Sequence, residues 1–107
     1  MKVPALHPQF ERDHGARAAH RLFVACANRH GTDITPVAEF LASLYDARRI
    51  QVDAYMLCRG TSSDCFEDVL NVMRWFRQTE NGFDIQHIVD RDDGDLLIRS
   101  LFEKVSH

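Results

Sequence analysis

Two stripes of apolar residues, close together in the chain, constrain its fold most strongly. They are Phe40, Leu41, Leu44 and Tyr45 in the first stripe, and Phe66, Val69, Leu70, Met73 and Phe76 in the second. Residues spaced three or four positions apart lie on one face of an α-helix. Because each apolar face must be buried against another element, residues 40–75 are predicted to form the centre of a helical core.

Helix start and stop signals bracket these stripes. Thr35, followed by a proline, is expected to cap the first helix by accepting from free backbone amides. Asp53 and Gly60 enclose a short helix, in which Asp53 is the N-cap. A hydroxyl residue at positions 61–63 starts the longer helix, which is expected to end near Gln78.

The two ends of the chain add further helices. Apolar spacing within residues 16–27 and 97–105 predicts a first and a last amphipathic helix. The acidic residues around Gly94 are expected to form a solvated turn that caps the last helix. Residues 1–9 contain two prolines and are expected to be a loose N-terminal lead-in. The sequence therefore predicts an all-α protein, a compact bundle of five to six short helices in a single domain over residues 1–107.

Composition limits the possible functions. A length of 107 residues suits one domain with a real core, and a net charge of −3 is unlike that of a protein that coats nucleic acid. The odd number of cysteines favours a reducing cytoplasm. The first ten residues do not resemble a signal peptide, and no segment has the length of a membrane span. We therefore expect a cytoplasmic protein.

Motif searches predict no metal and no cofactor. Cys58 and Cys65 are too far apart for a C-x-x-C half site, and the acids around Gly94 do not match a calcium loop. A thiol enzyme is one alternative: Cys65 is expected in the first turn of a helix, where its pKa would fall, with His87 as its partner. The other alternative is that Cys65 packs in the core without reacting, and we expect no catalytic residue.

A protein-binding surface is the preferred functional interpretation. Trp75, the only tryptophan, lies at the edge of the second stripe between Arg74 and Arg77, a composition typical of interaction hot spots. Its alternative is a half-buried position at the edge of the core. The further candidates are Arg48 and Arg49 in the connector between the stripes, together with Tyr55. The arginines also allow a second hypothesis, a small DNA-binding or regulatory protein.

The middle of the chain resembles an uncharacterised family of small bacterial proteins found on plasmids and integrative elements. The residues that carry the resemblance are the runs V-A-E-F-L-A-S-L-Y-D at 37–46 and C-F-E-D-V-L-N-V at 65–72. The chain departs from the family pattern at Asp46, where Asn is usual, at Ala54, where Leu is usual, and at Val69, which replaces a cysteine.

The resemblance implies a mobile-element context and brings no activity or site residues. Small helical proteins of such elements often bind a host or phage protein, and inhibitors of CRISPR defence are one such class. We therefore predict a non-enzymatic binding protein with a protein partner of unknown identity and oligomeric state. Its expected contact residues are Arg48, Arg49, Tyr55, Arg74, Trp75 and Arg77.

Overall fold

The helix predicted from the first stripe, α2 (Thr35–Tyr45), lies at the centre of the molecule and is buried on most of its surface. The computed structural model describes residues 3–80 and 82–105. The elements in chain order are η1 (Pro8–Phe10), α1 (His14–Asn28), α2, α3 (Ala54–Arg59), α4 (Ser63–Gln78), η2 (Ile85–Ile88) and α5 (Arg91–Val105), where η denotes a 3-10 helix. This arrangement confirms the predicted small all-α bundle in a single domain.

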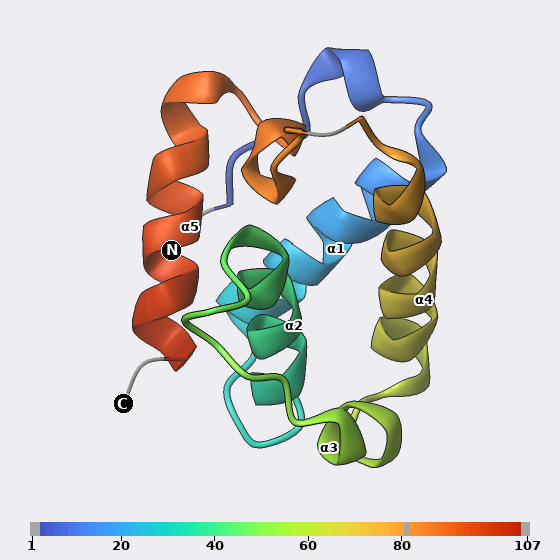
Figure 1. Ribbon diagram of the computed structural model, residues 1–107, viewed down its shortest axis with the longest axis vertical. Helices are drawn as coiled ribbons and strands as arrows, with labels where there is room; N and C mark the ends of the chain where they lie inside the picture. Colours follow the sequence, from blue (N-terminus) through green and yellow to red (C-terminus); the bar gives the residue numbers. More distant parts are fainter. Residues whose placement is uncertain (1–2, 81, 106–107) are drawn as a thin grey trace.

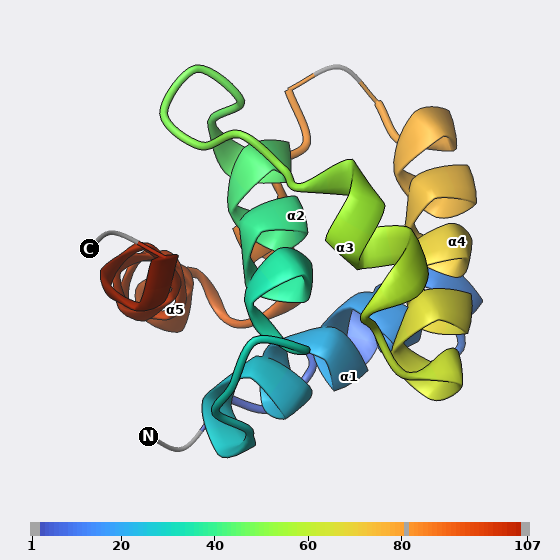
Figure 2. The same ribbon diagram turned by 90° about the horizontal axis from the view of Figure 1, so that it is seen from below.

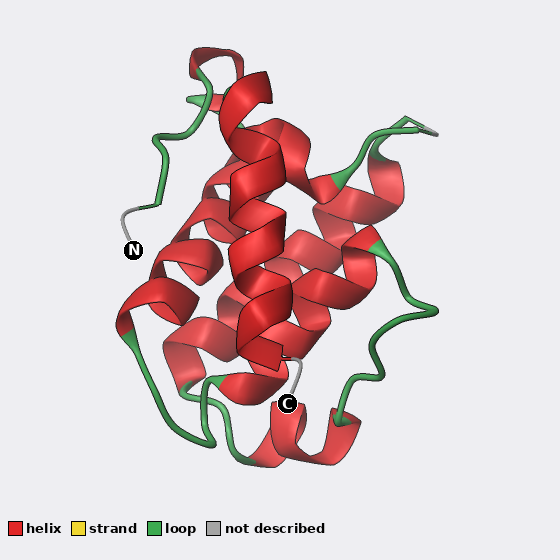
Figure 3. Ribbon diagram, turned by 90° about the vertical axis from the view of Figure 1, so that its left-hand side faces the viewer, coloured by secondary structure: helices red, strands yellow, loops and turns green. Residues whose placement is uncertain are grey.

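The two long outer helices lie on opposite sides of α2. Figures 1 and 2 both place α5 on one side of α2 and α4 on the other, with α1 running between the two sides. The helix α1 packs along α4 and also contacts α2, while α5 packs against α2 and η2. Figure 3 shows α5 in front of the bundle, so that its outer face is open. A residue on α4 and a residue on α5 therefore belong to different surfaces.

Local capping chemistry explains where most helices begin. The Asp53 side chain accepts from the backbone N–H of Met56 at 3.0 Å, and the Ser62 hydroxyl accepts from that of Cys65 at 3.4 Å. The sequence predicted the Asp53 cap, and it predicted the second cap as one of the three hydroxyl residues at 61–63. The prediction for Thr35 was wrong, because its hydroxyl donates to the carbonyl of Gly31 at 3.1 Å and does not cap α2.

The inner face of α4 is rotated relative to the predicted stripe. Cys65, Val69 and Val72 are buried, whereas Met73, which was assigned to the stripe, is 47% exposed. The helix carries apolar residues on more than one side, so periodicity alone does not select the side that faces the core. Packing along α1 selects it.

Asp92, Asp93 and Asp95 lie inside α5, which corrects the predicted turn, whereas Asp90 immediately precedes the helix. The helix begins at Arg91, and Asp92 and Asp93 occupy its first turn, where carboxylates favour the positive end of the helix dipole. Gly94 is buried, and an added Cβ would lie 3.1 Å from the carbonyl oxygen of Gln86. The glycine thus lets the start of α5 approach η2 closely.

Both ends of the described chain are tied to the bundle. The backbone N–H of His7 donates to the carbonyl of Ile88 at 2.7 Å, and Leu6 forms an antiparallel bridge with Val89. The carbonyl of Pro4 also lies 2.8 Å from the Nε2 of His20, so the lead-in is held from Pro4 onward, which differs from the expected loose segment. Met1 and Lys2 lie outside the described residues. Near the other end, the Lys104 ammonium donates to carbonyls in the last turn of α1 and just beyond it. None of the described helices is long and apolar enough to cross a membrane.

Candidate functional site

The six predicted contact residues lie in three different places. Arg48 and Arg49 lie in the connector between α2 and α3, and Tyr55 lies on α3. The other three, Arg74, Trp75 and Arg77, lie in the second half of α4. Since the connector reaches α5 through Arg49, and α4 lies on the opposite side of α2, the structure does not bring the six together (Figures 1 and 2).

Arg49 lies directly over an aromatic ring of α5. Its guanidinium carbon is 4.1 Å from the centroid of the Phe102 ring, within cation–π distance. Tyr45, at the end of α2, packs edge-on against the same ring, with centroids 5.9 Å apart. Phe102 is buried, whereas Tyr45 is 38% exposed. The contact fixes an exposed arginine and a partly exposed tyrosine side by side.

These three residues line a groove of about 480 Å³ between the connector and α5. We call it the Arg49 groove and define it by Tyr45, Arg49, Asp95, Arg99, Phe102 and Glu103. Asp95, Arg99 and Glu103 follow one another at four-residue spacing on α5, so the groove carries charges of both signs above an aromatic floor.

The neighbouring Arg48 has a different environment. Its side chain is 94% exposed, and its ion pair, at 3.6 Å, is with Asp46 of the same connector. Such an exposed pair contributes little to stability. Arg48 therefore carries the same charge as Arg49 at the adjacent position without lining the groove.

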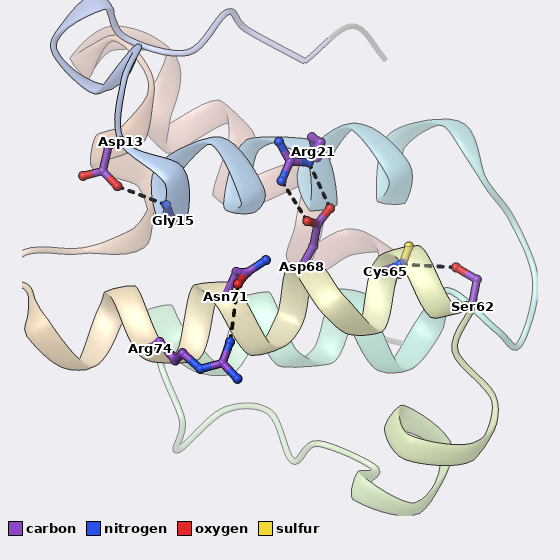
Figure 4. Close-up of polar contacts among 8 residues, drawn as sticks. All are labelled: Asp13, Gly15, Arg21, Ser62, Cys65, Asp68, Asn71 and Arg74. Carbon is purple, nitrogen blue, oxygen red and sulfur yellow. Dashed lines mark hydrogen bonds and ion pairs between the residues drawn. The ribbon is translucent and has the colours of Figure 1, made fainter.

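Tyr55, Arg74 and Arg77 are surface residues. Tyr55 is 71% exposed, the largest value among the exposed large apolar side chains of the described chain. Arg74 donates to the side-chain oxygen of Asn71, one turn earlier on α4, at 3.4 Å (Figure 4). Arg77 lies in the last turn of α4, where a cation favours the negative end of the helix dipole.

Trp75 joins α4 to the start of α1. Its indole N–H donates to the Asp13 carboxylate at 3.0 Å. The other oxygen of that carboxylate accepts from the backbone N–H of Ala16 and from that of Gly15, the contact drawn in Figure 4. Gly15 is buried against the tryptophan, since an added Cβ would lie 2.0 Å from the Trp75 Cβ. Trp75 is half-buried, which matches the core-edge alternative.

The exposed part of Trp75 lines an open hollow of about 770 Å³. We call it the Trp75 hollow and define it by Phe10, Asp13, Trp75, Glu80, Phe83 and His87. Sequence reasoning missed this group, because its members come from η1, α4, η2 and the segments between them. Nothing in the sequence places Phe10 and Asp13 beside residues 75–87.

A comparison with known protein families identifies the group to which the chain belongs. The model of a family of unknown function, DUF7673, matches residues 16–104. The chain belongs to DUF7673. No curated protein and no solved structure matches it. The match extends from the first turn of α1 almost to the end of α5, so the two outer helices and α2 are all part of the family domain.

In this DUF7673 domain, Cys65 lies in the first turn of α4, as predicted. It is 5% exposed, and the Arg29 guanidinium donates to its sulfur at 3.6 Å. The proposed partner, His87, lies in η2, where its Nδ1 accepts from the backbone N–H of Asp84 and its ring packs edge-on against Phe83. Among the described residues no group of three or more metal-ligating side chains occurs.

Cys26 is the second buried thiol of the DUF7673 domain, and burial raises its pKa from 9.0 to about 12. An unfolded chain ionises this thiol above pH 9.0, whereas the folded chain keeps it neutral. The contribution of the neutral Cys26 thiol to the free energy of unfolding is therefore complete below pH 9.0, and it is lost as the pH rises toward 12.

We expect the stability difference between the wild type and Cys26→Ala to depend on pH. By pH 10 the wild type should lose about 1.4 kcal/mol relative to the variant, because only its unfolded state gains a thiolate at position 26. Urea unfolding of both proteins at pH 7 and pH 10 measures this change. An unchanged difference would show that the thiol is solvated in the folded state.

Proposed function

We propose that this protein is a non-enzymatic protein-binding module whose partner docks in the Arg49 groove. One observation carries the proposal: the Arg49 guanidinium lies 4.1 Å above the Phe102 ring, beside Tyr45. Arginine and tyrosine, together with tryptophan, are the residue types most enriched among interface hot spots. Here both are accessible, and both are positioned by contacts within the protein.

The position of Arg49 lowers the cost of binding. A free arginine side chain loses rotamer entropy when a partner fixes it, and this loss offsets part of the contact energy. The contact with Phe102 has already restricted Arg49 in the unbound protein. Its planar fork can then donate two parallel hydrogen bonds to a partner carboxylate.

The charges of α5 define what else the partner should present. Arg99 adds a second cation beside Arg49, while Asp95 and Glu103 add carboxylates on the same helix. A partner segment with both acidic and basic side chains complements this pattern, and the complementary charges would fix its register. A purely polyanionic partner would meet the two carboxylates, which disfavours nucleic acid in this groove.

We expect Arg49→Glu to weaken partner binding at least about tenfold, and Arg48→Glu to change it less than about threefold. The two substitutions make the same charge change at adjacent positions, but only Arg49 lines the groove. Affinity capture from the native host with mass spectrometry identifies the partner, and titration of the purified partner measures the two dissociation constants.

Equal losses of partner affinity in Arg49→Glu and Arg48→Glu would contradict docking in the Arg49 groove. A complex with duplex DNA in a gel shift, with an affinity that falls steeply as salt is added, would instead indicate the alternative DNA-binding role. If both variants bind every captured partner as the wild type does, the groove is not the docking site.

The biological setting of the proposal is a cytoplasmic protein of a bacterial mobile element that inhibits a host defence system such as CRISPR. Its support is the sequence resemblance to proteins of plasmids and integrative elements. Expression of the wild type in a CRISPR-active host, followed by measurement of plasmid interference, tests it. Protection by the wild type and by Arg48→Glu, with loss of protection in Arg49→Glu, is the expected result.

A further inference from the structure

The Trp75 hollow combines aromatic rings with carboxylates, and nothing in the proposed docking function uses it. We propose that it binds an organic cation, an alkylammonium group carried on a larger molecule. The hollow lies with α4 and η2, and the Arg49 groove lies with α5. Binding at the hollow and binding at the groove can therefore be tested independently.

Aromatic rings from four parts of the chain meet around Phe83. Its ring centroid lies 5.4 Å from that of Trp75, 5.8 Å from that of Phe10 and 5.5 Å from that of His87. All three contacts are edge-to-face, with interplanar angles between 76° and 87°. Rings set perpendicular to one another present faces in different directions, as the walls of a cage do. An aromatic face carries negative partial charge and attracts a cation.

Two carboxylates line the hollow. Asp13 and Glu80 line it, and no lysine or arginine occurs among the described lining residues. Asp13 is fixed in place, because it accepts from the Trp75 indole N–H and caps α1. Glu80 is exposed and free to approach a ligand. Arg74, the nearest arginine before Trp75 in the chain, donates to Asn71 and does not line the hollow.

The size of the hollow indicates that the cation belongs to a larger ligand. At about 770 Å³ it approaches the upper range of small-molecule sites and far exceeds one ammonium group. The polar residues Gln9, Gln78 and Thr79 complete its wall and can bind the rest of the molecule. Two sources fit this chemistry: a free choline-like molecule, or a lysine side chain, methylated or not, within a peptide.

Trp75 is the only tryptophan in the chain, so its fluorescence reports on this site directly. Choline and its neutral isostere 3,3-dimethylbutan-1-ol are titrated at constant ionic strength. We expect a saturable change with choline, and binding of the isostere at least about tenfold weaker, since the two differ in charge and hardly in shape. Acetylated lysine amide and its trimethyl derivative, titrated in the same way, distinguish the peptide source from the free one.

Two matched variants locate the binding. Glu80→Gln removes the exposed carboxylate of the hollow and is expected to weaken choline binding about threefold, whereas Glu67→Gln, an exposed acid of α4 outside the hollow, should leave it unchanged. Phe83→Leu should abolish the fluorescence change, and its thermal melt checks that it folds. Equal response to choline and its isostere, no saturable response to any probe, or equal effects of the two glutamate variants would overturn the proposal.

Discussion

Replacing Gly15 with alanine is expected to destabilise the protein by about 3 kcal/mol or more, the upper range for overpacking a core. The added Cβ would lie 2.0 Å from the Trp75 Cβ and 2.1 Å from its Cγ. Rotation of the tryptophan side chain cannot relieve the contact with the Cβ, because the position of the Cβ is fixed by the α4 backbone. The helices α1 and α4 would have to separate, and they form the most extensive helix pair of the fold.

Gly94→Ala provides the matched control for this prediction. Gly94 is also a buried glycine in the first turn of a helix, but an added Cβ would lie 3.1 Å from its nearest neighbour, the Gln86 carbonyl oxygen. A shift of a few tenths of an ångström relieves that contact, and alanine gains up to about 1 kcal/mol of helix propensity. We therefore expect Gly94→Ala to change stability by less than about 1 kcal/mol. Urea unfolding measures both variants, and a Gly15→Ala protein as stable as Gly94→Ala would contradict the close packing of α1 on α4.

Local sequence signals predicted where the helices begin and end more successfully than which side of each helix is buried. The N-caps at Asp53 and Ser62 bond backbone amides three positions away, so the local sequence indicates Asp53 directly and narrows the second cap to the hydroxyl residues at 61–63. The buried face of α4 depends on where α1 lies. Met73 and Val72 are both apolar, and only the tertiary contact decides that Val72 is buried and Met73 exposed.

The contacts of the candidate site residues depend on tertiary structure even more than the buried face of α4 does. The sequence indicates that Trp75 and Arg49 are unusual residues, but not which residues they contact. Arg49 packs on Phe102 of α5, and Trp75 bonds Asp13, which precedes it by 62 positions. Gly15 lies in the first turn of α1, and the close approach of a tryptophan from another helix explains why no larger residue fits there. Contacts of this kind divide a single expected surface into a groove and a hollow.

The second large effect is expected for Asp13→Ala, which removes three hydrogen bonds at once. The Asp13 carboxylate accepts from two backbone amides of α1 and from the indole N–H of Trp75. Loss of an N-cap costs about 1 kcal/mol, and a part-buried indole N–H left without its acceptor costs about 1–2 kcal/mol more. We therefore expect a loss of about 2–3 kcal/mol in the free energy of unfolding, measured in urea at pH 7.

Asp53→Ala separates the two contributions, because the Asp53 side chain only caps a helix, accepting from Met56 at 3.0 Å. This control should lose about 1 kcal/mol, the cost of a cap alone. In Trp75→Phe the indole donor is absent, so Asp13→Ala should cost less in that background, with a coupling energy of about 1 kcal/mol. If Asp13→Ala costs no more than Asp53→Ala, and equally in both backgrounds, then the bond between Asp13 and Trp75 contributes nothing to holding α4 against α1.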